Sequence, residues 1–293
     1  MSRSSAAAAY LSLTKPTIVL LFGVTGYAVL LAEGSLGALK VLCVMLAMVA
    51  TAGSANALNM YFDRDIDAVM ERTKRRRPIP SEKISPERAA IFGLVLGLLA
   101  IAYFCVEVNY LAAFLSFFTI AFYVGIYTLC LKRRTPYNIV IGGIAGSTAP
   151  LIGAAAATGH LSPLSWVLFG VVFLWTPPHF WALAIAIQDE YAKAKVPMLP
   201  VTHGEKRTRL EIFLYTIVLV PFSLLPYFLK AAGAIYLGAA VALGCFYLWK
   251  TVIYLREKTR EASKKLFWVS IIYLFLLFLA FLADVGSRAF LAR

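Results

Sequence analysis

Charged residues are scarce in this chain. They make up 15% of its 293 residues, whereas 61% are hydrophobic and the mean hydropathy is +0.78. A soluble globular domain carries roughly 25% charged residues, so this composition excludes a soluble fold. The chain is expected to lie mostly within a lipid bilayer.

Cysteine and histidine are also rare, with 4 and 3 residues respectively. Cys43, Cys105, Cys130 and Cys245 all lie in apolar stretches and share no paired spacing. The sequence therefore supports neither a disulfide framework nor a zinc site, and these thiols are interpreted as apolar packing groups.

Acidic residues are the scarcer charged type. The chain has 15 Asp and Glu against 28 Lys and Arg, which gives a net charge of +13. The cations are divided among short loops and the aromatic residues lie in apolar stretches, a pattern that argues against a nucleic-acid partner. Contact with anionic membrane lipids is the expected consequence.

Long apolar runs dominate the remaining sequence. A helix needs about 20 apolar residues to cross the roughly 30 Å of hydrocarbon in a bilayer. This criterion predicts an all-α protein in which a single domain, 16–293, packs nine transmembrane helices around a central cavity open to the cytoplasmic side. The predicted spans are 16–34, 36–61, 89–106, 110–131, 137–158, 164–187, 210–230, 234–254 and 266–282.

Small residues in the fifth span favour close packing of helices. Gly142, Gly143, Gly146 and Gly153 fall within it, and small side chains let membrane helices approach one another.

The loop charges predict the orientation. Most lysines and arginines lie in the amino-terminal segment and in the loops after the second, fourth, sixth and eighth spans. By the positive-inside rule, we expect a multi-pass protein of the cell membrane with its amino terminus in the cytoplasm and its carboxyl terminus outside. Residues 1–15 lack the apolar core of a signal peptide and are expected to form a short cytoplasmic segment.

Acidic and amide side chains recur every four residues where the second span ends. If the helix continues past Tyr61, then Asn59, Asp63 and Asp67 lie on one face. Carboxylates so close together repel each other unless a cation joins them, which predicts a hard divalent metal. The basic run 72–77 follows, and its cations could complete a phosphate site or simply be a solvated loop.

A second acidic cluster, Asp189 and Glu190, ends the sixth span on the same predicted face. These neighbours diverge by about 100° on a helix, so they cannot share one stripe. The two acidic clusters could face each other, or the second could belong to a surface loop of ion pairs with Lys193 and Lys195. The basic group 132–134 closes the fourth span on the same side, either as part of the site or as a positive-inside flank.

His179 stands in an aromatic and proline-rich segment of the sixth span. Pro177 and Pro178 precede it and are expected to kink or break the helix, and Trp175 and Trp181 flank it. Such a histidine could be a hydrogen-bonded structural residue, could bind a metalloporphyrin or could move a proton.

Together these motifs resemble a known family. The Asn59-x-x-x-Asp63-x-x-x-Asp67 pattern, the acidic pair after the sixth span, Tyr127 and Lys132 look like the intramembrane UbiA-type prenyltransferases. Within that family, DRDID-x-x-x-x-RT, TPPHFWALA and VPMLPV are similar to the branch that farnesylates protohaem. The resemblance covers nearly the whole chain.

The resemblance implies transfer of farnesyl from farnesyl diphosphate to haem b with Mg²⁺ as cofactor, which gives haem O for terminal oxidases. It implies that Asn59, Asp63 and Asp67 hold Mg²⁺ on the diphosphate and that Asp189 and Glu190 form a second catalytic cluster. Downstream haem-modifying or oxidase-assembly membrane proteins are possible partners. The implied diphosphate contacts are Arg72, Arg77, Lys132, Lys193 and Tyr127, and the implied haem-proximal residues are His179, Trp175 and Trp181.

One departure concerns the second cluster. The family usually has Asp-x-x-x-Asp there, whereas Ile187 and Tyr191 occupy the corresponding acid positions in this chain. Whether this half holds a second magnesium ion or leaves it to the substrate therefore stays open.

The physical chemistry of the reaction adds a further expectation. An allylic cation needs a dry, electron-rich pocket, for which the candidate walls are Tyr127, Trp175, Phe180 and Trp181.

Two other functions share some of these features. A prenyltransferase with a quinone precursor as acceptor would have the same aspartates and fold. A transporter or haem-binding assembly factor would also carry intramembrane acids. A transporter's acids are expected near the middle of the membrane, whereas these lie at the predicted cytoplasmic ends of spans.

Overall fold

The computed structural model describes residues 3–34 and 36–291, and within those ranges the chain is helical with no strand. Nine segments of this described part are long and apolar enough to cross a membrane, which agrees with the number predicted from sequence. The elements are α1 (Arg3–Leu13), α2 (Pro16–Glu33), α3 (Ala38–Phe62), α4 (Arg64–Val69), α5 (Glu71–Lys74), α6 (Pro86–Tyr103), η1 (Phe104–Val108), α7 (Tyr110–Ala121), η2 (Phe122–Leu131), α8 (Asn138–Ser147), α9 (Ala149–Thr158), α10 (Pro163–Ala186), α11 (Gln188–Lys193), α12 (Leu199–Phe222), α13 (Leu225–Phe228), α14 (Ala234–Glu257) and α15 (Arg260–Leu291).

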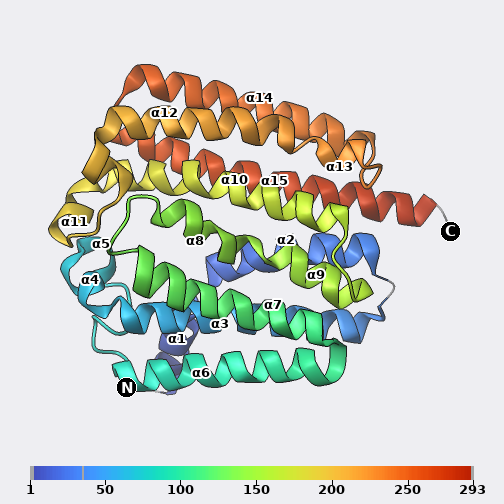
Figure 1. Cartoon of the computed structure of the whole chain (residues 1–293), viewed down its shortest axis with the longest axis horizontal. Coiled ribbons are helices and arrows are strands. Elements are labelled where there is room, and N and C mark those ends of the chain that lie inside the picture. Colours follow the sequence, from blue (N-terminus) through green and yellow to red (C-terminus); the bar gives the residue numbers. More distant parts are fainter. Residues whose placement is uncertain (1–2, 35, 292–293) are drawn as a thin grey trace.

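Three of the nine spans form the inside of the bundle. The buried share of the apolar window is 61% in the span of α3, 78% in that of α8 and α9, and 67% in that of α10, against 22–28% in the spans of α6, α7, α12 and α14. Figure 1 shows α14 and α12 at one edge of the bundle and α6 at the opposite edge. Side chains on the inner spans can therefore meet away from lipid.

Glycines allow the predicted close approach of helices. A Cβ at Gly153 would lie 2.4 Å from the carbonyl oxygen of Gly26, and one at Gly142 would lie 2.3 Å from Cδ2 of the Tyr127 ring. A Cβ at Gly143 would sit 3.1 Å from Thr176, whereas one at Gly146 would meet nothing within 4 Å. Three of the four fifth-span glycines thus face a neighbouring helix.

The structure corrects two expectations about the spans. Helix α10 continues through Pro177 and Pro178, so the expected break does not occur there. Packed neighbouring helices can satisfy the backbone groups that proline frees. The seventh span begins at Leu199, well before the predicted start at Leu210, and the chain kinks at Gly204, whose φ of 77° suits glycine.

The short helices α4, α5 and α11 gather at one end of the bundle, and the carboxyl-terminal end of α15 lies at the other (Figure 1). The carboxyl ends of helices α3, η2 and α10 lie beside these short helices. The predicted acidic and basic site residues are therefore close together at one end of the molecule.

Candidate active site

The predicted stripe of Asn59, Asp63 and Asp67 forms across a helix junction. Helix α3 ends at Phe62 and Asp63 caps it before α4 begins. The N–H of Asp63 donates to Asn59 O at 2.9 Å and that of Asp67 donates to Asp63 O at 2.8 Å, so the four-residue spacing survives the junction. All three side chains are buried.

Each buried carboxylate has a cation as partner. Lys132 pairs with Oδ2 of Asp63, and Arg77 pairs with Oδ2 of Asp67. Asn59 Nδ2 also donates to Asp63 Oδ2 at 2.7 Å. An unpaired buried carboxylate would be strongly destabilising, so these cations make the cluster tolerable inside the protein.

The π-helix η2 supplies the opposite wall. The N–H of Lys132 donates to Tyr127 O at 2.8 Å, a wide turn of the kind often found at functional sites. Thr128, on the same segment, accepts a hydrogen bond from Asn59 Nδ2 at 3.1 Å. Tyr127 stacks on Tyr123 with ring centroids 5.1 Å apart, and the Lys132 ammonium lies 5.9 Å from the Tyr127 centroid.

Lys15 is a site residue that sequence reasoning missed. Its Nζ donates to Asn59 Oδ1 at 2.9 Å. Burial, together with the nearby cations Arg77 and Lys132, holds the pKa of the Lys15 ammonium well below its usual value. The sequence does show a lysine directly before the first span, but this charge was interpreted only as an indicator of membrane orientation.

The cluster offers the kind of ligands that a magnesium ion prefers. Oδ1 of Asp63 is buried and has no hydrogen-bond partner, and every candidate ligand is an oxygen, as a hard cation prefers. Within the described ranges there is no group of three or more His, Cys, Asp or Glu residues placed to hold a metal. Two carboxylates and an amide would thus bind Mg²⁺ together with oxygens of a phosphate ligand.

The second acidic cluster divides between two partners. Glu190 Oε2 accepts the backbone N–H of Arg72 at 3.0 Å, which ties α11 to α5 beside the first cluster. Asp189 instead forms two hydrogen bonds with Arg260 of α15, at 2.5 and 2.9 Å. Arg260 also lowers the pKa of the Asp189 carboxyl. Only Glu190 therefore turns toward the first cluster.

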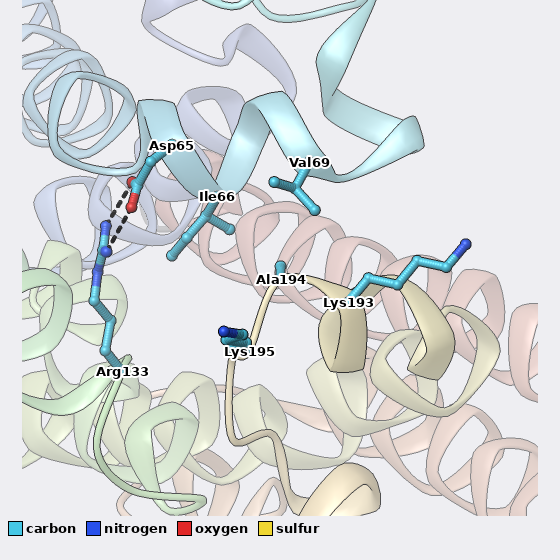
Figure 2. A pocket seen from close by; sticks show the side chains of 7 residues that line it. All are labelled: Asp65, Ile66, Val69, Arg133, Lys193, Ala194 and Lys195. Carbon is cyan, nitrogen blue, oxygen red and sulfur yellow. Dashed lines mark hydrogen bonds and ion pairs between the residues drawn. The ribbon is translucent and has the colours of Figure 1, made fainter.

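A pocket of about 360 Å³ opens between α4 and α11 (Figure 2). On one side Arg133 donates two hydrogen bonds of 2.7 Å to Asp65, which lowers the pKa of that carboxyl. On the other side lie Lys193 and Lys195, with the Lys193 side chain extended away from Asp65 in Figure 2. Cations therefore outnumber carboxylates around this pocket.

His179 lies in the interface of α10 and α15. Its ring stacks between Trp175 and Phe267, with centroid distances of 4.2 and 4.5 Å, and Nδ1 lies 2.8 Å from Ser270 Oγ. Both ring faces are thus covered. Trp181 packs edge-on against Tyr215 of α12 at 5.5 Å, so the aromatic side chains of this segment point in several directions.

The candidate pocket walls separate into two groups. Tyr127 and Phe180 belong to one apolar cluster together with Ile66 of α4, directly beside the acidic residues. Trp175 and Trp181 belong to the larger core around α10, α12, α14 and α15. The structure therefore brings Tyr127 and Phe180 together near the carboxylates and places both tryptophans elsewhere.

The fold and site define the class of protein. A multi-pass helical membrane protein with buried carboxylates, buried cations and an adjoining aromatic cluster at one end is suited to bind a phosphorylated, apolar molecule.

The comparisons specify this class. The model of the UbiA prenyltransferase family matches residues 19–282. The chain is 50% identical to protoheme IX farnesyltransferase of Gloeobacter violaceus, over 92% of this chain and 90% of that protein. It is 48% identical to protoheme IX farnesyltransferase of Acidiphilium cryptum, over 94% of this chain and 90% of that protein. The chain belongs to the UbiA prenyltransferase family.

Solved structures share the fold. A structure of digeranylgeranylglyceryl phosphate synthase superposes with a TM-score of 0.78 at 23% identity, covering 96% of this chain and 98% of that one. A UbiA homologue from Archaeoglobus fulgidus bound to DMAPP and Mg²⁺ gives a TM-score of 0.67 at 16% identity, covering 93% and 98%. At these identities the likeness concerns the fold alone.

Proposed function

We propose that this chain is a protohaem IX farnesyltransferase. It transfers the farnesyl group of farnesyl diphosphate to a vinyl group of haem b and so forms haem O. The observation that carries this proposal is the identity of 48–50% over nearly the whole chain to relatives of that name. The arrangement of carboxylates and cations beside an aromatic cluster supports it.

The diphosphate is proposed to bind at the ends of α3 and η2. Asn59, Asp63 and Asp67 would hold Mg²⁺, which neutralises the charge that develops on the diphosphate when the allylic carbon–oxygen bond breaks. Arg77 and Lys132 lie against the two carboxylates, which supports the proposal that they bind diphosphate oxygens. Arg72, Lys193 and Tyr127 are proposed as further contacts of the diphosphate. Asp189 and Glu190 of α11 are proposed as the second acidic cluster of the catalytic site.

The farnesyl chain is proposed to extend along the cluster that contains Tyr127, Phe180 and Tyr123. These rings are electron-rich and the surrounding side chains are apolar. Such walls stabilise an allylic cation and exclude water, which would otherwise capture it before the acceptor does.

Haem b is proposed to lie near α10, with its reacting vinyl group toward the farnesyl pocket. Ser270 binds Nδ1 of His179 and leaves Nε2 as the nitrogen that could contact haem. Trp175 and Trp181 would then support the haem site by packing. When the vinyl carbon forms its bond to the farnesyl carbon, water adds to the resulting cation and releases a proton, which leaves a hydroxyethylfarnesyl side chain.

The site end of this multi-pass membrane protein is proposed to face the cytoplasm, because most basic loops gather there. The amino terminus would lie on the cytoplasmic side of the cell membrane and the carboxyl terminus on the outer side. Membrane proteins that modify haem O or assemble it into oxidases are the proposed recipients of the product.

The test is to incubate the purified protein with haem b, farnesyl diphosphate and Mg²⁺ and to measure the mass of the product. We expect the haem O mass, its loss on chelation of the metal and its return when Mg²⁺ is added. Farnesylation of a quinone precursor in place of haem would refute the proposal. Unchanged haem affinity in His179→Ala would refute the placement of haem.

A further inference from the structure

Lys15 reaches the active site from outside the bundle of spans. It lies between α1 and α2, and its backbone φ of 54° is uncommon for a residue with a side chain. The side chain is partly buried and ends in the hydrogen bond from Nζ to Asn59 Oδ1. A residue held in such a conformation indicates that the surrounding contacts fix its position.

Contacts with α3 fix the corner that carries Lys15. Asn56 Nδ2 donates to Thr14 O at 3.0 Å, one residue before Lys15. A Cβ at Gly53 would lie 3.1 Å from Cγ2 of Thr14, so a small residue there allows the corner to approach. Leu13 is fully buried in the cluster that joins α1 to α3. Lys15 is therefore delivered to Asn59 by a packed corner.

The Lys15 ammonium forms no ion pair with the acids of the site, although Asp63 and Asp67 lie near enough to act on its charge. Lys132 and Arg77 pair with Asp63 and Asp67, whereas Lys15 contacts only the neutral amide oxygen of Asn59. Within the described ranges Lys15 makes no ion pair with a carboxylate. The diphosphate is proposed to bind beside Asn59. Its negatively charged oxygens would therefore be the natural partner of the Lys15 ammonium.

We propose that Lys15 is a further ligand of the diphosphate group, an inference that rests on the proposed function. Asn59 Oδ1 is a proposed metal ligand, and two cations repel each other at one oxygen. A metal held by Asn59 would take the place of Lys15 at the amide oxygen, and the Lys15 ammonium would then be free to bind the diphosphate. Lys15 thereby adds a third cation to Arg77 and Lys132 from an element that the sequence motifs do not include.

The experiment measures binding of inorganic pyrophosphate to the purified full-length protein, by its competition with farnesyl diphosphate, with and without Mg²⁺. Loss of one charged hydrogen bond predicts about 10- to 100-fold weaker binding in Lys15→Gln. Lys15→Arg should restore much of it. Lys40→Gln is the matched control, because Lys40 pairs with Glu107 beside α7, away from Asn59, and should bind as the wild type does.

Steady-state kinetics provides the second measurement. Lys15→Gln should raise KM for farnesyl diphosphate and leave KM for haem b unchanged. Pyrophosphate binding equal to wild type, or a rise in KM for haem b alone, would overturn the proposal. Weaker pyrophosphate binding in a protein that does not farnesylate haem would uphold the role of Lys15 and reject the proposed acceptor. If Lys15→Gln fails to fold, Lys15→Met decides. A purely structural lysine predicts wild-type pyrophosphate affinity in that variant, whereas the proposal predicts the same loss of binding as in Lys15→Gln.

Discussion

Replacing Asp63 by asparagine tests both the stability of the site and its chemistry. The Asp63 side chain is fully buried, and it binds Lys132 and Asn59. Neutralising it leaves the ammonium of Lys132, a side chain that is only 13% exposed, without its counter-ion. Breaking a buried pair by removing one partner costs about 3–5 kcal/mol of unfolding free energy.

The effect on catalysis should be separable from the effect on stability. The loss of one group that stabilises developing charge lowers a turnover rate by about 10²–10³. In Asp63→Asn combined with Lys132→Met, both charges of this pair are removed, so most of the lost stability should return. Farnesyl transfer should stay as low as in the single variant or fall further, because both groups are proposed to act on the diphosphate.

The assay combines reversible unfolding in mixed detergent micelles with mass analysis of the haem product. Asp65→Asn is the matched control two residues away in α4, since the Asp65 side chain is 61% exposed in its pair with Arg133. An exposed pair contributes about 0–1 kcal/mol, so this variant should fold and turn over nearly as the wild type does. Farnesyl transfer at the wild-type rate by Asp63→Asn would show that the Asp63 carboxylate is not needed for the reaction. A double variant as unstable as the single one would show that the ion pair does not explain the loss.

Two further predictions concern the contact of α8 with Tyr127 and the start of α14. In Gly142→Ala the new Cβ would lie 2.3 Å from Cδ2 of Tyr127, so the ring must shift and turnover should fall about 10-fold. Gly146→Ala, whose Cβ would meet nothing within 4 Å, should be neutral, and equal activities of the two variants would contradict the argument. Asp284→Ala should lower the unfolding free energy by about 2–3 kcal/mol, because the buried carboxylate accepts the N–H of Gly233 at 2.7 Å before α14. Since Asp284 lies toward the carboxyl end of α15, KM for farnesyl diphosphate should not change, and a raised KM without loss of stability would refute this structural role.

The sequence by itself determined the membrane class and the number of spans, because a hydrocarbon slab of fixed thickness requires apolar runs of about 20 residues. It also placed Asn59, Asp63 and Asp67 in one register, since backbone hydrogen bonds four residues apart carry that spacing across the α3–α4 junction. The likeness to prenyltransferases rested on strings that are local in the chain, so it too could be found without a structure.

Only the tertiary structure decided which side chains meet across helices. Lys15 contacts a residue 44 positions away, and Arg260 binds Asp189 from a helix 71 positions later, separations that no local pattern encodes. The stacking of His179 between Trp175 and Phe267 likewise depends on how α15 packs against α10. Local spacing fixes the register within one helix, whereas pairings between helices follow from how the side chains of the whole bundle pack together.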